Sequence, residues 1–510
     1  MRLAELIGTL SLAVDASIGL PDSHALRSAT LAARLADIVG ADAGTRQDCY
    51  YLALLALCGC TTESATMADV MGDEIAWGEQ TLGVDYGRPQ EMMAALLRVM
   101  RKRHGPVAGV LAMGRVLGRV PKMAAVNRAH CEVGVHLAER FGFAESFRAA
   151  LYQAFERWDG SGMPKRVRGD GIALCMRIVH VAIDVDIGYC LGGVEGAVGH
   201  TKKHARRGLD PELVERFQGK ARDICAVLSA PSPWAAAMDS EPAPQRNVDS
   251  DAIDAGLRAI ADYADLKSRF TLGHSPGVAR RASAAAERLG LDRTTVQNLA
   301  RAALIHDIGR VGISGGIWDK REPLSDAERE RIRLHTYIGE RLLSRSPALE
   351  PIAAIATLAH ERLDGTGYHR RLPASACSMP ARVLAAADVL QALTENRPHR
   401  RAFTEEAAKA EVVALARNGK LCPEAVNAVV GAAPAGGGAA RSDLLSEREA
   451  DVLRLVARGL TNKEVANELA ISPKTVGHHL QHVFEKLGVT TRAAASVIAL
   501  QRGLVGDDAR

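Results

Sequence analysis

The stretch TTVQNLARAALIHDIG, residues Thr294–Gly309, decides which fold the sequence predicts. Its apolar residues recur at intervals of three and four, which is the pattern of a helix that buries one face. The helix ends in the adjacent pair His306 and Asp307, whose side chains leave a helix about 100° apart. Imidazole nitrogen and carboxylate oxygen are both metal-binding groups, so such a pair can grip neighbouring ions. We therefore expect a helical domain with a metal site at the end of this helix.

Three further stretches supply candidates for the same site. Asp388 stands in the otherwise apolar helix pattern RVLAAADVLQALT, and a buried carboxylate needs a cation or hydrogen-bond partners. His335 begins HTYIGERLL, and His360 begins HERLDGTGYH. Donors of these types suit Fe, Mn or Zn, which lower the pKa of a bound water and make hydroxide available near neutral pH. We expect one or two divalent ions as the cofactor and hydrolysis of a phosphoester as the natural reaction.

The N-terminal part of the chain repeats this pattern. His24 precedes Ala56 by 32 residues, the same interval that separates His274 from His306. The strings FERWDGSGMP and HERLDGTGYH are also alike, so we predict a duplicated domain. The next interval is 74 residues in the first copy and 29 in the second, which places an insertion in the first copy, near residues 61–120.

The first copy lacks most of the candidate ligands. An Ala-Leu pair holds the position of the His-Asp pair, and only His24 and His130 remain of the set. Asp184 and Asp186 lie near the place of the late aspartate but out of register with it, so we expect both to be structural. A site without its ligands cannot hold a catalytic metal. We expect this copy to be a non-catalytic sensor or packing partner.

Two stretches interrupt the helical pattern and predict linkers. Residues 229–251 are rich in Pro, Ser and acidic residues, and residues 431–443 are rich in Gly and Ala. The expected domains are therefore 1–228, 252–430 and 444–510.

Composition limits the class of protein. The net charge of +4 comes from 64 basic and 60 acidic residues, so any contact with nucleic acid must be local. Nine cysteines without paired spacing indicate reduced thiols, and no apolar run of roughly 18 residues is present to span a membrane. We expect a cytoplasmic protein with no membrane partner.

The C-terminal segment, which begins at Leu444, carries clear signals of four helices. Ser446 with Glu449 and Thr461 with Glu464 fit capping boxes, and Ser472-Pro473 is a typical helix start. The tight turn at residues 469–472 separates the second and third helices as in a helix-turn-helix. The third helix, residues 473–487, is then the recognition helix for double-stranded DNA. The residues expected to face the major groove or the phosphates are Lys463, Lys474, Thr475, His478, His479 and Arg492.

The residues of the middle domain resemble the HD-GYP family, the phosphodiesterases of bacterial cyclic-di-GMP signalling, across Asp254–Cys422. His274, HDIGRVGI, HTYIG, HERLDGTGY and ADVLQALTENRPHRRA carry the resemblance. It implies a cyclic dinucleotide or other phosphoester as ligand, and Asp307 as a bridge between two ions. Arg310 stands where the family has a lysine near the phosphate, so Asp307 and Arg310 are the implied catalytic residues. The implied metal ligands are His274, His306, Asp307, His335, His360 and Asp388.

Three positions depart from the family pattern. Ala359 replaces the first of two paired histidines, Arg310 replaces the lysine, and His369 replaces the proline that closes the GYP motif. One ligand is therefore missing, and His369 is a candidate substitute for it.

The C-terminal segment resembles the LuxR-type (GerE-like) DNA-binding domain over its full length, through SEREADVLRLVARGLTNKEVANELAISPKTVGHHLQHVFEKLGV. The resemblance implies a homodimer, because the fourth helix, about residues 491–501, commonly mediates dimerisation in that family.

The expected fold is all-α, with tandem HD-domain-like helical bundles followed by a four-helix LuxR-type helix-turn-helix domain. Three functions remain open. The first is a DNA-binding transcriptional regulator whose body senses or hydrolyses a phosphoester. The second is an active metal-dependent phosphodiesterase with an attached DNA-binding head. The third is a regulator whose body is a non-catalytic dimerisation scaffold.

Overall fold

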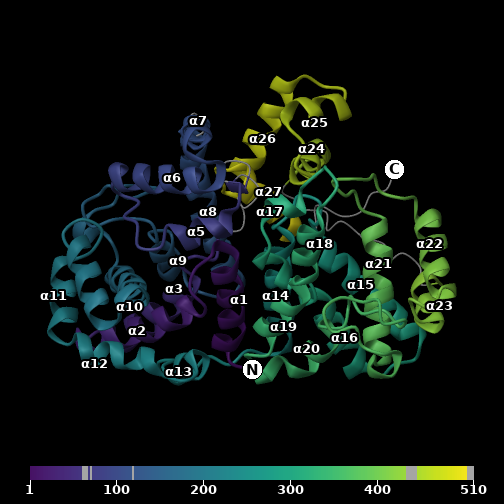
Figure 1. Cartoon of the computed structure of the whole chain (residues 1–510), viewed down its shortest axis with the longest axis horizontal. Coiled ribbons are helices and arrows are strands. Elements are labelled where there is room, and N and C mark those ends of the chain that lie inside the picture. The colour runs from purple at the N-terminus through teal and green to yellow at the C-terminus, as the bar shows by residue number, and fades with distance from the viewer. Residues whose placement is uncertain (60–66, 69–71, 118–119, 432–444, 502–510) are drawn as a thin grey trace. The chain divides into compact units, whose positions relative to one another are not determined.

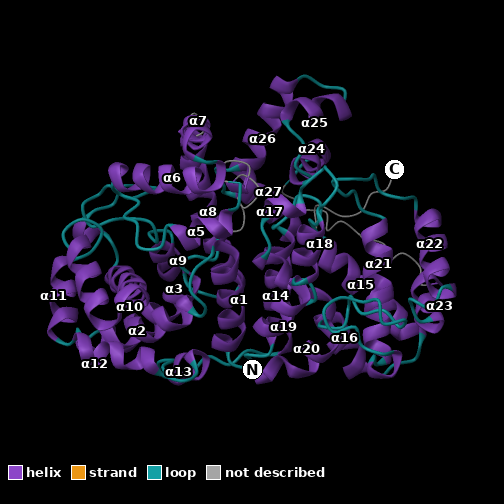
Figure 2. Ribbon diagram, viewed as in Figure 1, coloured by secondary structure: helices purple, strands orange, loops and turns teal. Residues whose placement is uncertain are grey.

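The computed structural model describes residues 1–59, 67–68, 72–117, 120–431 and 445–501. All regular secondary structure in these ranges is helical, and β-pairing is limited to isolated bridges (Figure 2). The expected all-α class is confirmed. The chain divides into two compact units, Met1–Ile253 and Asp254–Arg510, whose helices are labelled in Figure 1. None of the described helices is long and apolar enough to cross a membrane.

Four helices form the framework of each unit, and the two sets correspond. In the first unit α2 packs against α1, α3 and α10, and in the second α15 packs against α16 and α21. Three of the four pairs have equal lengths, with 16 residues in α1 and α14, 15 in α2 and α15, and 13 in α3 and α16. The bounds are α1 (Leu3–Ile18), α2 (His24–Ile38), α3 (Ala43–Leu55) and α10 (Leu174–His204), and α14 (Ser250–Asp265), α15 (His274–Arg288), α16 (Arg293–Ile305) and α21 (Met379–Leu393).

The helix starts repeat in detail. Asp42 caps α3 by accepting a hydrogen bond from Thr45 N at 3.0 Å, and Asp292 caps α16 by accepting one from Thr295 N at 3.0 Å. An N-cap carboxylate satisfies amide groups that the helix leaves unpaired. The same local chemistry at the same place in both units supports the duplication that the sequence predicts.

The region of the predicted insertion forms helices of its own. α5 (Glu74–Gln80), α6 (Pro89–His104) and α7 (Pro106–Leu117) precede α8 (Val120–Arg140). Trp77, Leu96, Val99, Met100 and Val116 form a separate apolar cluster among these helices.

The stretch at 229–251 differs from the expected linker, because it folds against the first unit. It contains α13 (Pro233–Asp239), in which Pro233 occupies the first helical turn and Trp234 is only 7% exposed. Tyr51 donates a hydrogen bond to Glu241 at 2.6 Å, and Leu3 N donates one to the Arg246 carbonyl at 2.7 Å. The prolines start a helix rather than mark a flexible segment, since apolar side chains between them have a core to enter. The linker expected at 431–443 lies outside the described residues except for Gly431, which ends α23.

The remaining helices complete the units. In the first unit they are α9 (Glu145–Leu151), α11 (Pro211–Gly219) and α12 (Ala221–Cys225). Between residues 308 and 431 they are the 3-10 helix η4 (Ile308–Gly312), α17 (Gly315–Trp318), α18 (Asp326–Arg333), α19 (His335–Leu343), α20 (Glu350–Ala356), α22 (Glu405–Arg417) and α23 (Pro423–Gly431).

The C-terminal head has the four expected helices. Ser446 and Thr461 form capping boxes with Glu449 and Glu464, and Ser472 caps the third helix by accepting from Thr475 N at 3.0 Å. The helices are α24 (Glu447–Ala457), α25 (Asn462–Glu468), α26 (Pro473–Leu487) and α27 (Arg492–Gln501). Their core contains Val452, Val456, Val465, Ala466, Val476 and Leu480.

Candidate metal centre and nucleic-acid interface

Five segments of the second unit bring the predicted ligands together. His274 begins α15, His306 follows the last residue of α16, His335 begins α19, and Asp388 lies within α21. All are buried, with exposed fractions of 6% or less. The complete buried set is His274, His306, Asp307, His335, His360 and Asp388.

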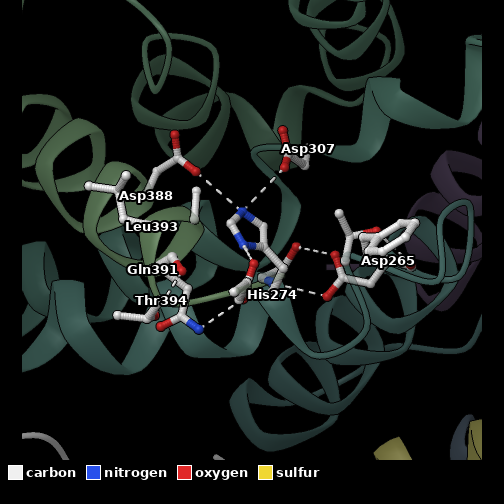
Figure 3. A network of polar contacts seen from close by, with 12 residues as sticks. Asp265, His274, Asp307, Asp388, Gln391, Leu393 and Thr394 are labelled. Carbon is white, nitrogen blue, oxygen red and sulfur yellow. Dashed lines mark hydrogen bonds and ion pairs between the residues drawn. The ribbon is translucent and has the colours of Figure 1, made fainter. Parts of the chain in front are cut away.

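His274 stands between the two carboxylates of the centre (Figure 3). Its Nε2 atom lies 3.2 Å from Asp388 Oδ1 and 3.6 Å from Asp307 Oδ2. Its Nδ1 atom lies 2.9 Å from Glu395 Oε2, which fixes the orientation of the ring.

Asp307 is in contact with imidazoles on both of its oxygens. Oδ1 lies 3.1 Å from His360 Nε2 and 3.2 Å from His335 Nε2. Oδ2 lies 3.3 Å from His306 Nε2 and 2.7 Å from Arg310 Nε. The two oxygens of Asp307 therefore contact different histidines: Oδ1 contacts His335 and His360, and Oδ2 contacts His306.

Backbone carbonyls orient two of the histidines. His306 Nδ1 lies 2.8 Å from the Ala303 carbonyl, and His335 Nδ1 lies 2.6 Å from the Ile332 carbonyl. A ring that donates from Nδ1 presents a free electron pair at Nε2, which is the form that binds a metal.

The donor atoms fit a metal ion. His306 Nε2, His335 Nε2 and Asp307 Oδ2 are buried and make no hydrogen bond within the described part of the chain. The contacts of these atoms with one another and with Arg310 do not satisfy them as hydrogen bonds, and a cation would satisfy all three. Two groups of three residues in the centre each have their ligand atoms within 4.8 Å of one another. The first group is His274, His306 and Asp388. The second is His306, Asp307 and His360, so His306 belongs to both.

The charges of the centre are strongly coupled. Burial raises the pKa of Asp307, but Arg310 and His306 outweigh burial and hold this pKa well below the usual range. Burial lowers the pKa of His306, yet the Asp307 carboxylate more than compensates and raises it to about 10. At His360 burial dominates and lowers the pKa to about 4. The centre thus combines ionised carboxylates, which attract a cation, with a neutral imidazole that can bind one.

Arg310 lies beside the centre, between Asp307 and Trp318. Its guanidinium carbon is 4.8 Å from the centre of the Trp318 ring, and its Nε atom contacts Asp307. The aromatic ring and the carboxylate hold the guanidinium in place.

His369 does not join the centre, so the structure does not support it as a substitute ligand. Its Nδ1 atom lies 2.7 Å from Thr336 Oγ1, and its Nε2 atom lies 3.1 Å from Glu340 Oε2. Both ring nitrogens are therefore engaged by side chains of α19, namely the hydroxyl of Thr336 and the carboxylate of Glu340. Ala359, which is 1% exposed, leaves the position of the first paired histidine without a ligand.

Glu395 was not predicted from the sequence. It follows Asp388 by seven residues, which is about two helical turns, so both side chains face the same way. The seven-residue spacing is the feature of the sequence that points to Glu395. The residue lies beyond the C-terminal end of α21 at Leu393, so the apolar helix pattern does not include it.

The first copy corrects one expectation about register. His24 Nδ1 lies 2.6 Å from Asp186 Oδ2, so Asp186 corresponds to Asp388 of the second copy. Arg27 also contacts Asp186, which confirms that this aspartate has structural partners. His130 is turned away to the Ala56 carbonyl, with its Nε2 atom at 3.3 Å.

The predicted DNA contacts occupy different environments in the head. Lys463, Lys474 and His478 are exposed, and Thr475 and His479 are half-buried. Arg492 is half-buried, and its guanidinium donates to Asn462 Oδ1 at 2.9 Å and to the Leu460 carbonyl. These internal partners tie α27 to the start of α25.

The fold and the site define a class: a helical protein with a buried cluster of histidines and aspartates of metal-binding type and a helix-turn-helix head. The family described as "HD domain" matches residues 258–424, and "Bacterial regulatory proteins, luxR family" matches residues 443–499. The chain therefore contains an HD domain and a LuxR-type regulatory domain, as both sequence resemblances predicted.

Relatives extend the match beyond the HD domain. The chain is 26% identical over 411 residues to 3'3'-cGAMP-specific phosphodiesterase 3 of Vibrio cholerae, covering 79% of this chain and 88% of that protein. It is 36% identical over 175 residues to a cyclic di-GMP phosphodiesterase of Thermotoga maritima, covering 34% of this chain and 46% of that protein.

A solved structure shares the fold. The crystal structure of a cyclic GMP-AMP specific phosphodiesterase of V. cholerae superposes with a TM-score of 0.59 at 22% identity. The match covers 85% of this chain and 97% of that one.

Proposed function

We propose that this protein is a DNA-binding transcriptional regulator whose HD body binds or hydrolyses a cyclic dinucleotide. The observation that carries the proposal is the convergence of four buried histidines and two aspartates in the same chain as a helix-turn-helix head. The partner of the head is double-stranded DNA, bound by a homodimer that forms through α27, and such a regulator acts in the cytoplasm.

The residues of the centre have distinct roles in this proposal. His274, His306, Asp307, His335, His360 and Asp388 hold one or two divalent ions of the Fe, Mn or Zn class, and Asp307 contacts histidines of both ligand groups. The ion supplies Lewis acidity and a source of hydroxide near neutral pH. Arg310 donates hydrogen bonds to a phosphate oxygen through the guanidinium N–H groups that do not contact Asp307.

The class of ligand is supported by the relatives. Their names give 3'3'-cGAMP and cyclic di-GMP as substrates. Both molecules carry two phosphodiester groups and two purines, so a cation centre beside Arg310 suits either. The sensing form of the proposal is favoured by Ala359, which removes one ligand, and the hydrolytic form by the two remaining ligand groups.

The test uses the full chain and a variant with His306→Ala and Asp307→Ala. Each is incubated with Fe²⁺, Mn²⁺ or Zn²⁺ and with 3'3'-cGAMP or cyclic di-GMP, and products and binding are measured separately. DNA sites selected from a random pool then report affinity with and without the dinucleotide.

Metal-dependent turnover that the double variant loses would establish the hydrolytic form. Binding without turnover, coupled to a change in DNA affinity, would establish the sensing form. Absence of dinucleotide binding to the metal-loaded chain would overturn both forms and leave the scaffold.

A further inference from the structure

The first unit contains a second group of metal-type side chains, which the HD centre does not use. Asp184, His200 and His204 all lie on α10, but Asp184 is 16 and 20 residues from the two histidines. These separations would keep the groups far apart on a straight helix, at about 1.5 Å per residue. The helix must therefore fold back for them to meet.

Two glycines break α10 and allow this reversal. Gly192 and Gly193 have non-helical backbone angles, and the φ of Gly193 is 62°. A side chain at Gly188 would lie 2.7 Å from the Ala197 Cα atom, so the two arms pack at very close range. The break and the close contact together place residues of the second arm opposite Asp184.

The three side chains meet with metal-binding geometry. One donor atom from each lies within 4.8 Å of the others. His204 Nδ1 is 2.6 Å from Asp184 Oδ2, and His200 Nε2 is 3.8 Å from Asp184 Oδ1. The histidines are four residues apart on one helical face, the spacing by which helices present two imidazoles to one ion.

A simple hydrogen bond between Asp184 and His204 leaves part of the group unexplained. His204 is buried, and its Nε2 atom makes no hydrogen bond within the described residues. The same holds for Oδ2 of the buried Asp85, whose charge acts on His200. Burial lowers the pKa of His200, with Lys203 and His204 adding to the effect and Asp184 and Asp85 opposing it.

We propose that Asp184, His200 and His204 bind a divalent transition-metal ion of the zinc class. Two imidazoles and one carboxylate form a donor set of three-ligand zinc sites, in which a further position stays open. Bound here, the ion links the two arms of the α10 hairpin and stabilises the first unit. The site is independent of the HD centre and of the function proposed for it.

The experiment uses the full chain with His306→Ala and Asp307→Ala, so that the HD centre contributes little metal. This parent and two further variants, His200→Ala and His136→Ala, are dialysed against Zn²⁺, and bound zinc is measured by mass spectrometry. His136 is the control, because it is a helix histidine of the same unit that pairs with Glu139 at 3.3 Å. Replacing His200 leaves the hydrogen bond between Asp184 and His204 in place.

We expect the His200→Ala chain to hold about one zinc fewer than the parent and the His136→Ala chain. Zn²⁺ should also raise the unfolding temperature of the first unit in the parent by a few degrees, and His200→Ala should remove that shift. Equal zinc content and equal thermal response in the His200 and His136 variants would overturn the proposal.

Two alternatives keep the test decisive. If His200→Ala does not fold by circular dichroism, His200→Gln takes its place, because the glutamine fills the space with a weaker ligand. If the HD-centre background does not fold, the variants are compared in the unmodified chain, where the difference should again be about one zinc per molecule.

Discussion

Arg27 forms a two-point ion pair with the buried Asp186, its Nε atom 2.6 Å from Oδ1 and its Nη2 atom 3.0 Å from Oδ2. The corresponding position of the second copy, three residues after His274, is Gly277. A side chain there would lie 2.6 Å from atoms of Gln391. In the first copy a guanidinium thus compensates the negative charge of the buried carboxylate. In the second copy the corresponding carboxylate, Asp388, belongs to the candidate metal centre.

Replacing Arg27 with alanine should destabilise the first unit by about 2 kcal/mol, because it removes one of the two charged partners of the buried Asp186 and leaves only His24 beside this carboxylate. Thermal or urea unfolding of the full chain, followed in the first unit by hydrogen exchange, measures the loss. Arg34→Ala is the matched control, since Arg34 is exposed on the same helix. Similar stability of the two variants would show that Asp186 does not depend on the guanidinium.

The sequence predicts those parts of the molecule whose structure depends on neighbouring residues. The head was predicted helix by helix because Ser446, Thr461 and Ser472 cap their helices with neighbours three residues away. The sequence predicts the six candidate ligands of the HD centre because each stands in a short motif, with His306 and Asp307 in the same one. Both predictions depend on short-range patterns.

The structural features that the sequence does not predict depend on contacts between distant segments. The sequence spacing predicts that Asp186 is out of register, because the interval from the DGSG turn to this residue differs from that in the second copy. The group formed by Asp184, His200 and His204 was hidden, because helical periodicity does not reveal that Gly193 reverses the chain. The Pro-rich pattern predicts a linker around Trp234, since only the folded first unit provides the core that this side chain enters.

Ala359→His should raise the metal content of the HD centre, since it supplies an imidazole directly before His360. We expect the number of tightly bound ions to increase toward two per chain, measured by mass spectrometry after dialysis. Ala354→His on the exposed face of α20 controls for surface binding by the added histidine. An unchanged metal content in a folded Ala359→His chain would mean that this position does not face the centre.

Arg310→Gln should weaken the affinity for a cyclic dinucleotide by about tenfold to a hundredfold, because a charge-assisted hydrogen bond to phosphate is lost. The metal content should stay the same, since Arg310 is not a ligand. Calorimetric titration and metal analysis of the same sample separate the two effects, with the exposed Arg401→Gln as control. Loss of metal would instead assign Arg310 to maintaining the Asp307 carboxylate.

Glu449 makes the stability of the head dependent on pH. Despite burial, hydrogen bonds from Lys486 and Ser446 lower its pKa from 4.5 to about 2. The folded state therefore favours the carboxylate, so its stabilisation is complete above pH 4.5 and is lost as the pH falls toward 2. Lys486 is 41% exposed, so we expect only about 1 kcal/mol.

Glu449→Gln should remove most of this pH dependence, because glutamine retains the capping hydrogen bonds but not the charge. Hydrogen exchange of α24 and α26 in the full chain, corrected for intrinsic rates, measures it. Glu447→Gln, an exposed residue of the same helix, should behave like the unmodified chain. A pH response that survives in Glu449→Gln would have to come from other groups.

Lys474→Ala should weaken DNA binding nearly equally for all sequences if Lys474, which is exposed in the first turn of α26, contacts a phosphate, because phosphate contacts carry no sequence information. Loss of one phosphate contact should reduce the slope of log affinity against log salt by about 1 per subunit. Affinities measured by fluorescence anisotropy across a salt series, on selected and scrambled DNA, give both quantities. Lys420→Ala in the HD domain is the control. A loss confined to the selected sequence, with the salt slope unchanged, would instead make Lys474 a reader of bases.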